Sequence, residues 1–123
     1  MPVLGASADQ KLIEAAVRRY FDARSRLDFV GIQSVYPGAT DGERTQLRVI
    51  DRGCKAYSEE PLRIDILRHD GLTASVEAQV RSYCHQRVGK QAPPLRVDIT
   101  MKLEKKAGDT YRITQVNRPD QIR

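Results

Sequence analysis

The sequence predicts an α+β domain in which three helices precede a curved four-strand antiparallel meander. Apolar residues recur with the spacing of an amphipathic helix up to about residue 50, and then alternate with polar residues from residue 62 onward. Glycine and proline interrupt these patterns where one element should end and the next begin. A change of period from about 3.6 to 2 along one chain is typical of helices followed by strands.

Length and composition are those of one globular domain. The chain has 123 residues, of which 40% are hydrophobic and 30% are charged, so we expect a single domain over 1–123 with an ordered core at about 7–117. No run of 18 apolar residues is present, which predicts no membrane span. The opening ten residues lack the features of a signal peptide. We therefore favour a cytoplasmic location for a complete chain, or an extracytoplasmic one for an excised domain.

The first helix is predicted from a capping signal and one apolar stripe. Ser7 and Gln10 have the spacing of a capping box. Residues at i, i+3, i+4, i+7 and i+8 then form the stripe: Ile13, Ala16, Val17, Tyr20 and Phe21. This face should pack against the sheet.

Two shorter helices are expected next. Asp28 can cap the second, which should end at Pro37 and Gly38. Thr40 and Glu43 again have capping-box spacing and should open the third. Gly53 is placed to end that helix in a left-handed conformation.

Four strands follow, and their alternation indicates one buried and one exposed sheet face. The residues expected on the buried face include Leu62, Ile64, Val76, Val80, Val97, Ile99, Met101 and Ile113. The residues expected on the exposed face include Arg63, Glu77, Arg81, Arg96, Asp98, Lys102 and Arg112.

Turn chemistry and charge pairing predict a strand register. Gly71 should have positive φ in a short hairpin. Opposite charges favour one another across antiparallel strands. The expected cross-strand pairs are Ile64 with Val76, Arg63 with Glu77, Arg81 with Asp98, Glu77 with Lys102, and Arg112 with Glu104.

One segment carries a family resemblance. Between Tyr20 and Gly38, an aromatic-rich first helix leads to a basic–acidic pair, Arg26 and Asp28, and then to a helix that ends at Tyr36 and Pro37. This resembles NTF2-like domains appended to bacterial serine/threonine kinases and other multidomain proteins. Residues 111–114 also resemble the start of the family's last strand. The resemblance implies the NTF2-like cone fold of the SnoaL and ketosteroid isomerase relatives.

No catalytic residue can be assigned. Isomerase-type relatives use an acid that faces the cone pocket, whereas Asp65, Glu77 and Asp98 fall on the outer face by alternation. His69, His85, Ser75 and Ser82 have no partner set that indicates a reaction. The residues expected to line a pocket are Tyr20, Tyr36, Tyr57, Val80, Ile99 and Met101.

The two cysteines, Cys54 and Cys84, do not form a CxxC pair, and no zinc site is predicted. We interpret them as buried free thiols, with a single disulfide as the alternative. The net charge of +5 comes from interspersed residues, a pattern that argues against a nucleic-acid partner.

These patterns favour a non-catalytic module that binds a small apolar ligand or a protein, within a larger bacterial protein and without a cofactor. The alternative is a small-molecule enzyme of the isomerase, dehydratase or cyclase type. A homodimer is expected through the outer sheet face, at Arg63, Glu77, Arg81, Asp98, Lys102 and Arg112.

Overall fold

The computed structural model describes residues 4–106, 108 and 110–119. Three helices come first in the chain: α1 (Leu4–Ser25), α2 (Phe29–Val35) and α3 (Asp41–Gly53). Four strands follow: β1 (Cys54–His69), β2 (Thr73–Gln86), β3 (Leu95–Lys106) and β4 (Thr110–Asn117). Among the described residues, no helix is both long enough and apolar enough to cross a membrane.

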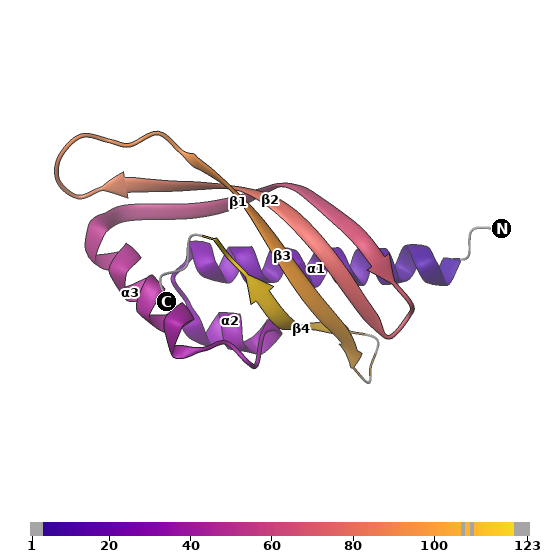
Figure 1. The fold of residues 1–123 in the computed structure, drawn as a ribbon. Helices are drawn as coiled ribbons and strands as arrows, with labels where there is room; N and C mark the ends of the chain where they lie inside the picture. The colour runs from indigo at the N-terminus through magenta and orange to yellow at the C-terminus, as the bar shows by residue number, and fades with distance from the viewer. Residues whose placement is uncertain (1–3, 107, 109, 120–123) are drawn as a thin grey trace.

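The strands form one antiparallel sheet in the order β1-β2-β3-β4. The sheet curves across the long α1, and α2 and α3 lie at the end of the molecule where α1 ends (Figure 1). This arrangement confirms the predicted α+β class and element order.

The helix ends agree only in part with the capping signals. The Asp28 carboxylate accepts a hydrogen bond from the Gly31 N–H at 3.0 Å, so the predicted cap of α2 is confirmed. Helix α1 begins at Leu4, which places Ser7 inside the helix and not at its cap. Thr40 precedes α3 without a side-chain cap bond, and the Glu43 side chain is buried in the protein interior. Gly53 ends α3 without the expected positive φ.

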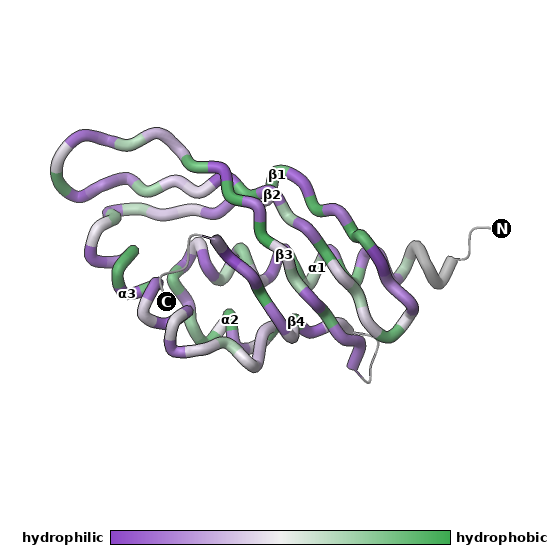
Figure 2. Tube along the Cα trace, viewed as in Figure 1, coloured by the Kyte–Doolittle hydropathy of each residue, from purple (hydrophilic) through white to green (hydrophobic). Residues whose placement is uncertain are grey.

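The core lies between α1 and the inner face of the sheet. Strands β2 and β3 alternate buried and more exposed residues as predicted, an alternation visible in the hydropathy colours along both strands (Figure 2). Ile13, Val17, Val80 and Ile99 are fully buried. Leu62 was expected in this core but is 38% exposed, because the β1–β2 register shifts between Pro61 and Arg63.

Two of the three predicted registers are wrong. Ile64 lies opposite Ala78, and Glu77 lies opposite Asp65 on one side and Thr100 on the other. Arg81 faces Arg96 and not Asp98. Irregularities in β1 change the pairing with β2, and exposed charge pairs are too weak to fix the pairing with β3.

The remaining turn and register predictions are confirmed. Glu104 lies opposite Arg112, and the side chains form an ion pair at 3.6 Å. Gly71 has φ +90°, as the hairpin requires.

Candidate functional site

A buried charged cluster, formed by Arg24, Glu43, Glu59 and Arg118, joins the helices to the sheet. Their exposed fractions are 0%, 2%, 4% and 6%. Arg24 comes from α1, Glu43 from α3 and Glu59 from β1, while Arg118 directly follows β4. Charged residues are rarely this buried unless they are paired.

Glu59 is the centre of the cluster. Its Oε2 accepts hydrogen bonds from Arg24 Nε at 3.0 Å and Nη2 at 2.9 Å, and from Arg118 Nη2 at 2.9 Å. Its Oε1 accepts from Arg118 Nη1 at 3.1 Å. The Tyr57 hydroxyl also donates to Oε2. Two guanidinium groups and a phenol therefore surround this carboxylate.

Glu43 occupies the helical side of the cluster. Its Oε1 accepts from the Tyr20 hydroxyl at 2.7 Å and from Arg24 Nη1 at 2.8 Å. Arg24 Nη1 also lies 2.9 Å from Gln46 Oε1. Arg24 thus connects the carboxylates of α3 and β1, and the four charged residues balance in sign.

Local structure explains how these side chains meet. Tyr20 and Arg24 are one helical turn apart and share the inward face of α1. The Ser25 hydroxyl accepts from the Glu59 N–H at 2.8 Å and donates to Phe21 O at 2.9 Å, which holds β1 against the end of α1.

The opposite charges in the cluster stabilise the ionised form of one another. Burial alone would raise the pKa of Glu59, but Arg118 and Arg24 outweigh it and hold this pKa below its usual value. Burial disfavours the charged form of Arg24, yet the Glu59 carboxylate keeps that pKa above the ordinary value. Burial and the negative charge of Glu59 raise the pKa of Tyr57 to about 12. Glu59 is therefore ionised and Tyr57 is neutral at neutral pH.

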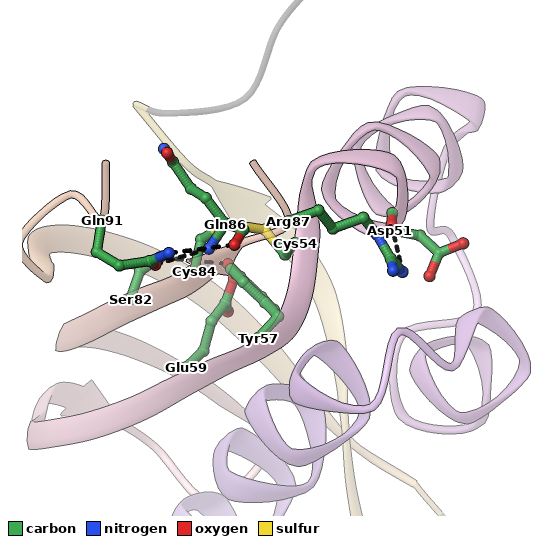
Figure 3. Close-up of a disulfide and its surroundings, with 9 residues drawn as sticks. All are labelled: Asp51, Cys54, Tyr57, Glu59, Ser82, Cys84, Gln86, Arg87 and Gln91. Carbon is green, nitrogen blue, oxygen red and sulfur yellow. Dashed lines mark hydrogen bonds between the residues drawn. A yellow bond between two sulfur atoms is a disulfide. The ribbon is translucent and has the colours of Figure 1, made fainter. Parts of the chain in front are cut away.

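Cys54 and Cys84 form a disulfide, with an S–S distance of 2.06 Å, so the interpretation as free thiols is wrong. The pairing of β1 with β2 brings the two residues within 5.3 Å between Cα atoms. The disulfide lies close to Tyr57 and Glu59 (Figure 3). Disulfides of this kind are typical of oxidising compartments.

The described residues contain no group of three or more His, Cys, Asp or Glu side chains arranged to hold a metal ion. The buried charged cluster itself consists of carboxylates and guanidinium groups, with phenols in contact with them.

The residues predicted to line a pocket lie in two settings. Tyr20 and Tyr57 contact the buried charged cluster, and Tyr57 lies on β1 shortly after the end of α3. The Tyr36 ring packs against Tyr20, with 6.3 Å between ring centroids. The other three are core residues that are at most 2% exposed: Val80, Ile99 and Met101. Their role in holding a ligand stays a prediction.

The predicted dimer face carries ion pairs within the chain. Arg63 pairs with Asp65 at 2.8 Å, and Arg81 pairs with Glu60 at 3.0 Å. Glu77 is half-buried, whereas Asp98 and Lys102 are exposed. The outer face is therefore polar, as its alternation predicted.

Sequence reasoning missed the central residues of the cluster. Arg24 continues the stripe of α1, four residues after Tyr20, and Glu43 lies one turn before the buried Leu47 on α3. A charged residue on an apolar stripe was therefore a usable signal for both. Glu59 and Arg118 lie in irregular segments of the alternation, which offered no such signal.

The fold is shared with proteins of known structure. A candidate scytalone dehydratase from Novosphingobium aromaticivorans DSM 12444 superposes with a TM-score of 0.74 at 15% identity, covering 93% of this chain and 85% of that one. An NTF2-like superfamily protein from Salmonella enterica serovar Typhimurium LT2 gives 0.73 at 12% identity, with 96% and 94% covered. The chain has the NTF2-like fold.

A third match is the hexachlorocyclohexane dehydrochlorinase LinA-type3 from Novosphingobium barchaimii LL02. It gives a TM-score of 0.74 at 10% identity, with 97% of this chain and 92% of that one covered. No protein-family model and no curated protein sequence matches the chain. At such identities the similarity establishes the NTF2-like fold, and the activity must be argued from the residues.

Proposed function

We propose that this chain is a non-catalytic binding module. The observation that carries the proposal is the state of Glu59, the carboxylate at the centre of the buried charged cluster. Both of its oxygens accept hydrogen bonds from guanidinium groups. It is 4% exposed, so a substrate would have to displace an arginine to reach it.

A general base in such a fold needs the opposite properties. It must reach the substrate with a free lone pair, and its pKa should lie near the working pH. A raised pKa for an interior carboxylate would favour an enzyme. The arginines instead lower the pKa of Glu59. The neighbouring Tyr57 hydroxyl already donates its proton in a hydrogen bond to Glu59. That proton is therefore not free to be given to a substrate.

Side chains fill the space between the helices and the sheet, so we place ligand binding at the outer surface of the protein. Tyr20, Val80 and Ile99 are fully buried, and the cluster occupies the space between α1, α3 and β1. In this proposal the ligand is a small molecule, and the module works as part of a larger bacterial protein.

An enzyme that catalyses an elimination is the second candidate. Structural neighbours include a candidate scytalone dehydratase and a dehydrochlorinase. In such a reaction a base removes a proton from carbon while the adjacent carbon loses water or chloride. Glu59 could serve as that base only after Arg118 withdrew, because Arg118 contacts both of its oxygens.

Incubation with scytalone and with hexachlorocyclohexane, the compounds in those names, tests the elimination directly. We expect both compounds to be recovered unchanged by mass spectrometry, from wild type and from Glu59→Gln alike. Conversion by the wild type would establish the enzyme. Its loss in Glu59→Gln, with Glu59→Gln shown to be folded by its amide spectrum and Glu60→Gln still active, would assign the base, since Glu60 is the exposed neighbour on the same strand.

A further inference from the structure

An open groove lies where the end of α1 meets α2 and α3. Its volume is about 430 Å³, within the range of small-molecule sites. Leu27, Phe29 and Leu47 supply its apolar surface. The groove is distinct from the buried charged cluster, whose four residues do not line it.

The backbone at Leu27 is held in an unusual conformation that places this residue in the groove. Leu27 has φ +56° and is the only non-glycine residue with positive φ in the described part of the chain. It occupies the position after α1 that glycine usually takes, where its N–H donates to Arg24 O at 3.0 Å and the Asp28 N–H donates to Ala23 O at 2.9 Å.

Arginines form the polar rim of the groove. Arg44 and Arg48 are one turn apart on α3, and Arg26 lies at the end of α1. Arg26 pairs with Asp22 at 3.1 Å. Arg44 stacks 4.5 Å above the Phe29 ring.

The charge of the rim is not balanced within the groove. No ion pair is found for Arg44 or Arg48 among the described side chains. Asp51 is the one acidic residue among those that line the groove. The local potential is therefore positive, beside an apolar floor.

We propose that this groove binds a small organic anion, a carboxylate with an aromatic or aliphatic body. Guanidinium groups bind carboxylates through charge-assisted hydrogen bonds, and Leu27, Phe29 and Leu47 would contact the apolar body. The stacked Arg44 guanidinium is already oriented over Phe29, which reduces the ordering needed on binding. This inference rests on the proposed binding function and assigns its ligand class.

The test uses 2-naphthoate as the probe and 2-naphthamide as its neutral counterpart, each titrated into the ¹⁵N-labelled chain at low salt. We expect 2-naphthoate to shift amide signals of residues 26–29 and 44–51. The amide compound should bind more weakly, and added salt should weaken only the naphthoate complex, because the attraction is between exposed charges.

Two double variants with the same change of net charge make the assignment specific. Arg44→Gln/Arg48→Gln should weaken naphthoate binding about tenfold, the loss expected for charge-assisted hydrogen bonds. Arg18→Gln/Arg52→Gln should leave it unchanged, because both residues are exposed and neither lines the groove. Exposed substitutions of this kind leave folding intact, which the amide spectrum itself checks.

Three results would overturn the assignment: no binding of 2-naphthoate at millimolar concentration, shifts outside the groove, or equal weakening by both double variants. Amide signals of groove residues that shift when only the protein concentration is raised would show that a second copy of the chain occupies the groove. None of these results depends on Glu59, so a failed groove and a failed binding function remain distinguishable. Turnover by the wild type that is lost in folded Glu59→Gln would refute the non-catalytic function and would leave the groove assignment intact.

Discussion

At the scale of single residues, the main feature is a carboxylate that two arginines neutralise inside the protein. A buried ion pair is not by itself a source of stability, because removing charges from water costs several kcal/mol per ion. Removing one partner is nonetheless severe, since the others stay buried without compensation. Arg24 and Arg118 both pair with Glu59, and Arg24 also pairs with Glu43.

Glu59→Gln should lower the free energy of unfolding by about 3–5 kcal/mol, because it removes the buried negative charge that Arg24 and Arg118 share. The matched control is Glu60→Gln, whose carboxylate is 59% exposed and pairs with Arg81 at the surface. That change should stay within about 0.5 kcal/mol. Urea denaturation at pH 7 measures both, and equal losses would show that Glu59 has no special role.

Acid should reduce the difference between wild type and Glu59→Gln. The pKa of Glu59 in the folded chain lies below its reference value of 4.5. Its contribution to stability is therefore fully present above about pH 4.5 and is lost as the pH falls through the lower folded value. A difference that stays constant from pH 7 to pH 3 would contradict the charge pairing.

At the scale of elements, the disulfide ties the junction of α3 and β1 to the end of β2. Around this junction, the Arg87 guanidinium donates to Asp51 O at 3.2 and 3.3 Å (Figure 3). The same segment leads through Tyr57 to Glu59. The cross-link therefore restrains the strand that carries the central carboxylate.

Reduction of the disulfide should lower the free energy of unfolding. The cysteines are 30 residues apart, and closing a loop of that length contributes about 3–4 kcal/mol in the chain-entropy model. Urea denaturation with and without reductant measures the loss. The Cys54→Ser/Cys84→Ser variant should be insensitive to reductant, and a wild type that is equally insensitive would show that the bond contributes nothing.

The elements also show which sequence signals were reliable. Asp28 fixed the start of α2 because its cap bond is local to four residues. The Thr40 and Glu43 spacing located α3 correctly but misassigned Glu43, whose partners Tyr20 and Arg24 lie on another helix. A local spacing pattern cannot show that a side chain pairs with a residue far away in the sequence and not with its neighbour.

At the scale of the whole molecule, periodicity was sufficient to predict the order of helices and strands and the inner sheet face. The cluster was beyond such reasoning because its members are distant in sequence: Glu59 is 35 residues from Arg24 and 59 from Arg118. The register of β2 with β3 was missed because surface charges were given too much weight. Arg81 tolerates Arg96 opposite it by pairing with Glu60.

The outer sheet face makes a prediction about assembly. Its charges include the pairs Arg63–Asp65, Arg81–Glu60 and Arg112–Glu104, so an interface here would be polar. We expect a modest dimer at low salt that dissociates at high salt. Arg81→Glu should weaken it, because the change places a second negative charge beside Glu60.

Sedimentation at tens of micromolar, at low and high salt, measures this assembly. A wild-type monomer at low salt would disprove the dimer. A dimer that Arg81→Glu leaves intact would place the interface elsewhere.

The central claim is that Glu59 is a counter-ion for arginines and not a general base. The most direct measurement is a pH titration of its side-chain carboxyl carbon by ¹³C NMR. Because Arg118 and Arg24 favour the charged form, the Glu59 signal should stay that of a carboxylate throughout pH 8 to 5 and titrate only below its reference value of 4.5. A carboxyl that titrates between about pH 6 and 7, the range to which enzymes tune a catalytic glutamate, would contradict the account.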